Sequence, residues 1–367
     1  MTGEGASESA SGWRPHRHLA ERDERILAAH AAASEVLALP VDERLDRLRT
    51  DRACQTVEFA ELLIGLARER RFDAPREELR LARLALAAFA ADRDRARDDG
   101  WATAHALAWA EVGNALRIGG ELRTAAAAFH HARTAMRGST DPAAEVDLLK
   151  LEASFLSYRR EFARADRLLR RAERIQRHNA TPEALARIWI GMADAASRSA
   201  DFKRAISLLD LSLRFVDSRR SPHFVLGCVH NLAACLIEAG DWNGGLDLIE
   251  RSRPAYEQFG DPRLQGRRIW VEAQARCRGG QTDRGELLLA TARHRFVELA
   301  CPYEITLISL ELAMLYLHTG RWKQAEEAAV SARTLARAHG IESEGDAADA
   351  VLGDVSSRRM SRALPVC

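Results

Sequence analysis

Apolar and polar positions alternate along most of the chain with the period of an amphipathic α-helix, and the pattern recurs every 40 residues. Five of the ten prolines mark this interval: Pro142, Pro182, Pro222, Pro262 and Pro302. Proline is favoured at the first helical position, because its missing N–H would have no partner there. Four of the five preceding residues can cap a helix, namely Asp141, Thr181, Ser221 and Asp261. Each unit is therefore predicted to begin a helix at its proline.

Small residues recur with the same period. The three series are Gly113, Ala153, Ala193, Ala233, Ala273 and Ala313; Ala125, Ala165, Ala205, Gly245, Gly285 and Ala325; and Ala132, Ala172, Ser212, Ser252, Ala292 and Ala332. Bulky side chains such as Phe129 and Leu169 lie between the last two series. Small residues allow two helix axes to approach closely, and bulky ones fill the adjoining groove. Glycines that suit a left-handed turn stand between the two helices of four units, at Gly120, Gly240, Gly280 and Gly320. The pattern predicts an all-α stack of antiparallel helical hairpins.

The best-matching unit carries a family resemblance. It reads W-x-x-V-G-x-x-L from Trp109, followed by Gly120, Ala125, Phe129 and Ala132. This segment resembles the tetratricopeptide repeat, and the 40-residue unit is similar to the long-repeat variant of bacterial regulators. The resemblance covers six units, roughly residues 101–341. It implies a right-handed α-solenoid whose first helices line a concave groove.

Weaker helical patterns flank the repeats. Residues 19–100 are expected to form capping helices, with one over 19–39, and an irregular hairpin over 51–70 and 75–92. A capping helix is expected within 342–356, with Ala347, Ala350, Val351 and Val355 on one face. The segments 1–18 and 357–367 are expected to be disordered. Stability should then come from contacts between neighbouring units, so the array forms a single cooperative body.

Composition and charge indicate the cellular compartment and argue against some classes of binding partner. The 54 basic and 53 acidic residues give a formal net charge of +1, so no overall field attracts nucleic acid or an anionic membrane. The N-terminal segment 19–99 holds 15 Arg and 18 acidic residues, a net charge of −3, which argues against a DNA-binding helix-turn-helix. No apolar stretch is long enough to span a membrane, no leader pattern is present, and the six cysteines are widely spaced. We expect a cytoplasmic protein.

A search for catalytic or metal-binding motifs finds none. The chain lacks the glycine-rich nucleotide loops, the H-E-x-x-H zinc motif and the G-x-S-x-G nucleophile turn. Cys228, Cys235 and the pair His130-His131 lack the further convergent ligands that a metal needs, and the glycine pairs fall in turns. The sequence therefore predicts no enzyme activity, no cofactor and no metal site.

One charge pattern stands out. Five arginines recur at intervals of four, three, four and three residues: Arg160, Arg164, Arg167, Arg171 and Arg174. This spacing places them on one helix face, opposite apolar residues that include Leu168 and Leu169. The row is either a solvated outer face or a dock for an acidic protein surface or a phosphate backbone.

The resemblance also implies candidates for the concave groove. Transferred position by position, they are Asn114, Lys150, Arg187, Asp194, Asn231, Arg267, Trp270 and Gln274. Family members that hold a peptide's terminal carboxylate use a regular Lys/Asn/Arg clamp, from which Ser154 and Asp194 depart. Asn114 and Asn231 could instead hold a peptide backbone, and Arg187 and Arg267 could receive acidic side chains.

Two functions remain open beside a distant third. The leading hypothesis is a non-catalytic scaffold or adaptor that binds a peptide or a segment of a partner protein in its groove. The alternative is a regulatory protein that responds to a small signalling peptide or controls a transcription regulator. The distant third is an enzyme with an unrecognised site. The repeats alone do not indicate an oligomeric state.

Overall fold

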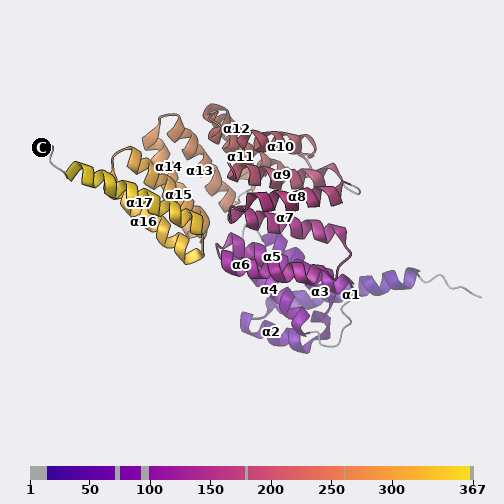
Figure 1. Cartoon of the computed structure of the whole chain (residues 1–367). Coiled ribbons are helices and arrows are strands. Elements are labelled where there is room, and N and C mark those ends of the chain that lie inside the picture. The colour runs from indigo at the N-terminus through magenta and orange to yellow at the C-terminus, as the bar shows by residue number, and fades with distance from the viewer. Residues whose placement is uncertain (1–14, 71–74, 92–98, 178–180, 260, 364–367) are drawn as a thin grey trace, which may run out of the picture.

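The computed structural model describes residues 15–70, 75–91, 99–177, 181–259 and 261–363. For residues 15–21, 75 and 358–363 it describes the backbone alone. Within these ranges the chain forms seventeen α-helices and one short 3-10 helix, and no strand (Figure 1). The expected all-α solenoid of antiparallel hairpins is confirmed.

The helices fall into an N-terminal group, six hairpins and a final helix. The N-terminal group is α1 (Pro15–Ala38), α2 (Val41–Thr50), the 3-10 helix η1 (Arg52–Cys54), α3 (Val57–Arg70) and α4 (Pro75–Ala91). The hairpins are α5 (Asp99–Ile118) with α6 (Leu122–Met136), α7 (Pro142–Tyr158) with α8 (Phe162–Gln176), α9 (Pro182–Arg198) with α10 (Phe202–Arg214), α11 (Pro222–Glu238) with α12 (Trp242–Phe259), α13 (Pro262–Arg278) with α14 (Thr282–Glu298), and α15 (Pro302–His318) with α16 (Trp322–His339). The last helix is α17 (Glu342–Ala363).

The prolines begin their helices as predicted. Each of the five occupies the first turn of the first helix of a hairpin. The side chains of Asp141, Thr181 and Asp261 accept hydrogen bonds from free N–H groups of the helix start. Ser221 makes no such cap and instead bonds to Glu183 of the preceding unit. The caps therefore hold for three units of the predicted four.

The turn inside each hairpin is left-handed whether or not glycine is present. Gly120, Gly240 and Gly280 have φ values of +79°, +103° and +80°. Arg160 and Ala200 occupy the same place with φ of +60° and +63°, a conformation that costs an L-residue free energy. The hairpin geometry thus imposes this conformation even where the sequence departs from glycine.

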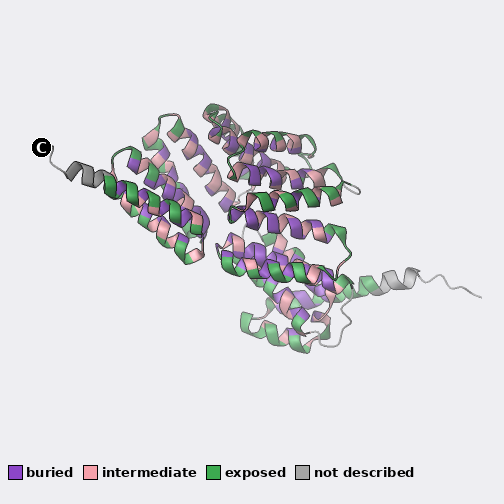
Figure 2. Cartoon of the chain, in the orientation of Figure 1, coloured by how far each residue is buried: buried purple, intermediate pink, exposed green. Residues whose placement is uncertain are grey.

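Small and large residues pack as the period predicts. A β-carbon built on Gly113 would lie 2.9 Å from Cε2 of Phe129, so only glycine leaves room for this ring. Phe129, Leu169 and Leu209 are each at most 2% exposed. Figure 2 shows buried residues along the faces where helices meet and exposed residues on the outward faces.

The first helices form the inner surface of the array. From α3 to α13, each first helix packs on the next first helix, whereas successive second helices lie farther apart. In a curved stack the closer layer is the inner one. Figure 1 shows the array bending until α15, α16 and α17 approach α5 and α6. Tyr303 and Ile341 accordingly belong to the same buried cluster as residues of α1 to α9.

Both ends differ from expectation. The structure adds α2, whose polar sequence buries only Leu48 and gave no clear apolar period. Residues 15–18 are helical, and α17 runs to Ala363, because no glycine or proline stops it between Gly353 and Pro365. The apolar face of α17 contains Ala348, Val351 and Val355, while Ala347 and Ala350 are exposed. The rest of the expected tails, 1–14 and 364–367, lies outside the described residues.

Candidate functional site

Among the predicted groove residues, Asn114 is enclosed. Its side chain is 1% exposed and its Nδ2 donates to Oε1 of Glu78 at 3.0 Å. Its Oδ1 accepts from Nη2 of Arg117 at 2.8 Å. The prediction that Asn114 faces a ligand is therefore wrong. The close packing of α5 against the N-terminal helices covers this position. The position of a residue within the repeat does not show whether an element outside the repeats covers it.

Three predicted residues lie on α7 and α9 with a partner on their own helix. Lys150 Nζ pairs with Asp147 at 2.9 Å, and Arg187 pairs with Glu183 at 3.1 Å. The Arg187 guanidinium also stacks on the Phe224 ring, 4.6 Å from its centroid. Both oxygens of Asp194 accept from Nε of Arg198 at 3.1 Å. These contacts fix the orientation of each charged group on a partly exposed surface.

Asn231 of α11 and Met314 of α15 are two side chains of the first helices that are open to a ligand. Asn231 is partly exposed, and within the described part of the chain its amide makes no hydrogen bond. It holds the position in α11 that Glu311 holds two units later in α15. Met314, which is not among the predicted groove residues, shares the repeat position of Asp194 and Gln274 and is 44% exposed. An amide and a flexible apolar side chain are suited to a peptide backbone and an apolar residue.

The remaining predicted residues bridge α13 to α15. Arg267 Nη2 donates to Oε1 of Glu304 at 3.2 Å, and the neighbouring Arg263 also pairs with this carboxylate. Seven residues further along, Glu311 accepts from Nε1 of Trp270 at 2.9 Å and from Nε2 of Gln274 at 2.7 Å. Glu304 and Glu311 thus each accept hydrogen bonds from two side chains of α13, and the two glutamates lie two helical turns apart on α15.

The two glutamates differ in charge behaviour. Burial would raise the pKa of Glu304, but Arg263 and Arg267 outweigh it and hold the pKa at about 2. Burial raises the pKa of Glu311 to about 7, because the hydrogen bonds from Trp270 and Gln274 offset it only in part. Glu304 is therefore a permanent anion, whereas Glu311 changes charge near neutral pH.

A second set of contacts closes the array on itself, and we call it the seam. Tyr303 of α15 lies against Tyr158 of α7, with ring centroids 4.4 Å apart. Arg198 Nη1 donates to the Tyr303 hydroxyl at 3.0 Å. Arg160, in the turn before α8, pairs with Glu344 of α17 at 3.7 Å. A few side chains thus join the last helices to units that lie more than 100 residues earlier.

Arg117 and Arg198 enclose the Tyr158 ring. Their guanidinium carbons lie 4.6 Å and 4.4 Å from its centroid. Burial would raise the pKa of the Tyr158 phenol, but the two arginines outweigh it and lower the pKa. Burial lowers the pKa of Arg117, and Arg263 and Arg198 act in the same direction. Arg117, Arg198 and Arg263 therefore lie close enough around Tyr158 to affect one another's charge.

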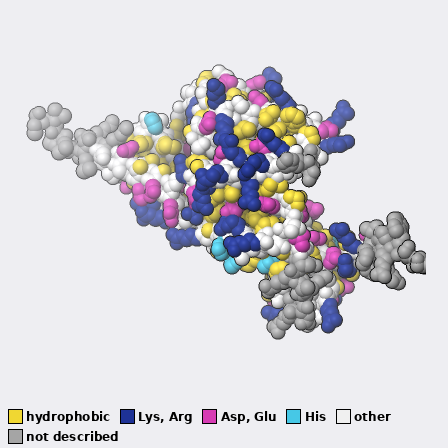
Figure 3. All heavy atoms as spheres, turned by 45° about the vertical axis from the view of Figure 1, so that its right-hand side comes forward, with side chains coloured by type: hydrophobic (Ala, Val, Ile, Leu, Met, Phe, Trp, Pro, Cys, Tyr) yellow, Lys and Arg dark blue, Asp and Glu magenta, His cyan; other side chains and the backbone are white. Residues whose placement is uncertain are grey.

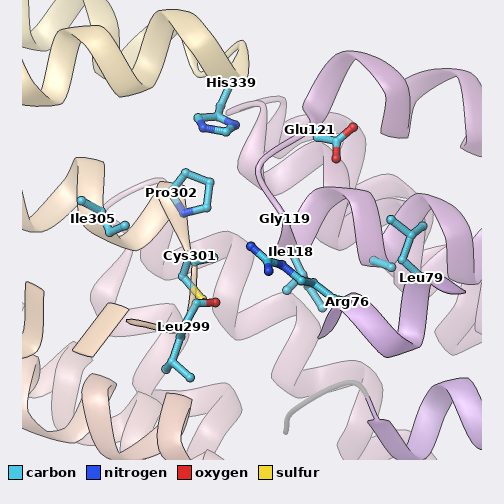
Figure 4. A pocket seen from close by; sticks show the side chains of 12 residues that line it. Arg76, Leu79, Ile118, Gly119, Glu121, Leu299, Cys301, Pro302, Ile305 and His339 are labelled. Atoms are coloured by element: carbon cyan, nitrogen blue, oxygen red, sulfur yellow. The ribbon is translucent and has the colours of Figure 1, made fainter. Parts of the chain in front are cut away.

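A cavity of about 340 Å³ lies at the seam (Figure 4). Leu79 and Ile118 line one side, and Leu299 and Pro302 line the other. Figure 4 shows Arg76 extending from α4 toward Cys301 and Pro302. Because its walls come from the two ends of the array, the cavity exists only while the seam is closed.

The five arginines of the predicted row do not all lie on one helix face in the structure. Arg164, Arg167, Arg171 and Arg174 are exposed on α8, where Arg164 pairs with Glu161 and Arg171 with Glu145. Arg160 does not belong to this face, because the left-handed turn directs it to Glu344 at the seam. We use the term basic ridge for the four arginines of α8.

The described residues form neither a metal-binding cluster nor a membrane-spanning helix. No three His, Cys, Asp or Glu side chains converge there in an arrangement that could hold a metal ion. None of the described helices has the length and apolar character needed to cross a bilayer.

The seam is not evident from the sequence. Tyr158 and Arg198 share one repeat position, a signal that was available. Their contact with Tyr303 depends on the curvature accumulated over several units, which no local pattern encodes. Glu304 and Glu311 were detectable as two acids seven residues apart on an otherwise apolar helix.

Comparison with known proteins supports the fold. No family model matches the chain, and no curated protein matches its sequence. A Rap protein complexed with Competence and Sporulation Factor is similar in structure, with a TM-score of 0.62 and 10% identity over 78% of this chain and 79% of that one. A signal-transduction ATPase with a tetratricopeptide repeat sensor, from Pyrococcus horikoshii, gives 0.54 and 12% over 96% of this chain and 54% of that one.

A third similar structure is NprR in complex with its cognate peptide NprX, with a TM-score of 0.50 and 12% identity over 74% of this chain and 78% of that one. At these identities the likeness establishes the architecture. The chain has a tetratricopeptide-type repeat fold.

Proposed function

We propose that this chain is a non-catalytic binding protein that holds an extended peptide, or a segment of a partner protein, on its inner surface. The observation that carries the proposal is that the first helices present both an amide without a hydrogen bond among the described residues, Asn231 on α11, and an exposed apolar side chain, Met314 on α15. On α9, the charged side chains of Arg187 and Asp194 are already oriented by partners. Binding then costs little side-chain entropy.

Two of the similar structures support this reading by what they contain. The Rap protein is complexed with Competence and Sporulation Factor, and NprR is complexed with its cognate peptide. In this chain the amide of Asn231 can both donate to and accept from a peptide backbone. Lys150 and Arg187, each partly exposed, can receive acidic side chains.

The seam favours a second candidate, a regulatory receptor that changes shape on binding. The seam that closes the array is small: it rests on contacts such as Arg198 with Tyr303 and Tyr158 with Tyr303, and α15 makes few close backbone approaches to α5, α7 and α9. A ligand on the inner surface that fits one curvature better than another shifts the array toward it. A saturating peptide that changes the radius of gyration in X-ray scattering supports the receptor, and an unchanged radius supports the adaptor.

We propose the cytoplasm as the compartment. Five cysteines are free thiols within the described part of the chain, and four of them are buried. Burial raises the pKa of Cys54 and Cys301 to about 11, which keeps these thiols protonated and unreactive. Unpaired thiols of this kind suit a reducing environment.

The proposal is tested with peptides selected from a random display library on the wild-type protein. Calorimetry then compares their affinity for Asn231→Ala and for Asn243→Ala, an exposed asparagine on the outer helix α12. We expect Asn231→Ala to weaken binding about 5–10-fold, through the loss of about 1 kcal/mol of hydrogen bonding. Asn243→Ala should change the affinity less than about 2-fold. Equal affinities for the two variants would refute the assignment.

A further inference from the structure

Positive charge concentrates on three neighbouring outer helices. The second helices α6, α8 and α10 contain ten Arg and Lys against three acidic residues, a net charge of +7. The second helices of the next three hairpins, α12, α14 and α16, contain eight basic and eight acidic residues, a net charge of zero. Figure 3 brings the side of the array with α7 to α10 forward and shows Lys and Arg side chains gathered across it. An otherwise neutral protein thus has one strongly basic outer face.

The basic ridge is the centre of this face. Its members lie three, four and three residues apart, so they share one side of α8, while Ala165, Leu169 and Ala172 are buried on the other. Arg167 and Arg174 have no ion-pair partner among the described residues. They are seven residues apart, which separates them by about 10.5 Å along the helix.

The acidic residues of this face are already engaged beneath the arginines. Asp166 accepts from Arg170 at 2.7 Å and also from Arg204 of α10. Glu173 accepts from Trp189 at 3.1 Å and from Arg177 at 2.9 Å. Burial would raise the pKa of both carboxyls, but these hydrogen bonds outweigh it and lower the pKa. The acids therefore anchor the surrounding side chains and leave the outward charge positive.

We propose that the basic ridge docks an acidic helical segment of a partner protein, with Arg167 and Arg174 each receiving a carboxylate seven residues from the next. The guanidinium fork of arginine matches a carboxylate with two parallel hydrogen bonds. An α-helix repeats a face every seven residues, so its carboxylates can meet both arginines at once.

Nucleic acid fits this surface less well. A DNA duplex presents one phosphate per about 1.7 Å of its axis, a continuous charge that rewards unbroken positive surfaces. The two unpaired arginines are instead well separated, and Glu161 and Asp166 lie beside the ridge.

The outer location makes this site independent of the inner surface. α8 is the second helix of its hairpin, whereas the proposed peptide site lies on the first helices. One molecule can therefore hold a peptide inside and an acidic partner outside.

The test compares two double variants of the full chain. Arg167→Gln with Arg174→Gln removes the unpaired charges of the ridge. Arg251→Gln with Arg284→Gln removes the same charge from exposed positions on α12 and α14. The probe is a fluorescent alanine-based helical peptide with glutamates every seven residues on one face. Anisotropy is measured at about 0.15 M salt and below, with a short DNA duplex as a second probe.

We expect the peptide to bind the wild type, with affinity that rises as salt is lowered. The ridge variant should lose at least about 10-fold in affinity and the control variant less than about 2-fold. Equal affinities of the ridge variant and the wild type would overturn the proposal, as would an absence of wild-type binding at low salt. Tighter binding of the duplex, lost in the ridge variant, would overturn it in favour of nucleic acid. Display-selected peptides of the inner surface should bind the ridge variant normally, which separates this result from failure of the proposed function.

Discussion

Arg198 and Tyr303 are 105 residues apart in the chain, yet the arginine Nη1 donates a hydrogen bond of 3.0 Å to the tyrosine hydroxyl. This contact forms because the repeat array curves back on itself. Units from α7 to α14 carry the chain round until the start of α15 returns to the ends of α7 and α9. The inner surface is consequently bounded on both sides, and its dimensions depend on whether the seam is closed.

The first prediction concerns the packing of the seam. A β-carbon built on Gly120 would lie 2.7 Å from Cγ of Pro302, whereas one built on Gly280 would meet nothing within 4 Å. The φ values of the two glycines are +79° and +80°, so alanine strains both backbones equally. We expect Gly120→Ala to cost about 1 kcal/mol more free energy of unfolding than Gly280→Ala, because it also displaces Pro302. Equal losses in denaturant titrations would show that the seam does not form in solution.

The second prediction concerns the buried anion of α15. Glu304 is 1% exposed, and it neutralises Arg263, which is 8% exposed. Glu304→Gln removes the negative charge and leaves a buried guanidinium unpaired, so we expect a loss of about 3 kcal/mol in the free energy of unfolding. Glu298→Gln, at an exposed position on α14, should change it by less than about 0.5 kcal/mol. A loss for Glu304→Gln no larger than for Glu298→Gln would contradict the buried ion pair between α13 and α15.

The third prediction is a pH dependence at Glu311. Burial raises its pKa from the ordinary value of 4.5 to about 7, so the folded state binds this proton more tightly than the unfolded state does. Below about pH 4.5 the group is protonated in both states and has no effect. As pH rises to 7, ionisation increasingly penalises folding, and the penalty is complete above pH 7.

Glu311→Gln removes this ionisation. We expect wild-type stability to fall by about 2–3 kcal/mol more than that of Glu311→Gln between pH 5 and pH 8. Urea titrations across this range measure the difference, and Glu327→Gln, an exposed residue of α16, serves as the control. Parallel pH profiles for wild type and Glu311→Gln would show that Glu311 ionises normally.

The sequence predicts the features that depend on contacts within a unit or between neighbouring units. It predicts few of the contacts between units that are far apart in the chain. Pro142 and its equivalents fix the helix starts, and Gly113 with Phe129 fixes the spacing within a hairpin, since both effects are local. Asn114 was misplaced because its side chain is covered from Glu78, which lies outside the regular period, and is held by Arg117 of its own helix. Tyr158 and Tyr303 come into contact because each unit is slightly rotated relative to the one before it and these rotations add up. The size of each rotation cannot be read from the sequence pattern.

The extent of α17 was missed for a different reason. Its residues after Val355 are mostly polar and give no apolar period, yet the helix continues to Ala363 because no glycine or proline interrupts it. Arg160 was assigned to a helix face by spacing alone. The left-handed turn, invisible in the spacing of arginines, directs it to Glu344 instead.

The most direct test of peptide binding on the inner surface is site-specific photo-crosslinking. A benzophenone amino acid replaces Met314, which is 44% exposed on the inner helix α15, or Leu287, which is 67% exposed on the outer helix α14. After illumination with a display-selected peptide, the account predicts a crosslinked product at Met314 and none at Leu287. Crosslinking at Leu287 alone, or equally at both positions, would contradict it.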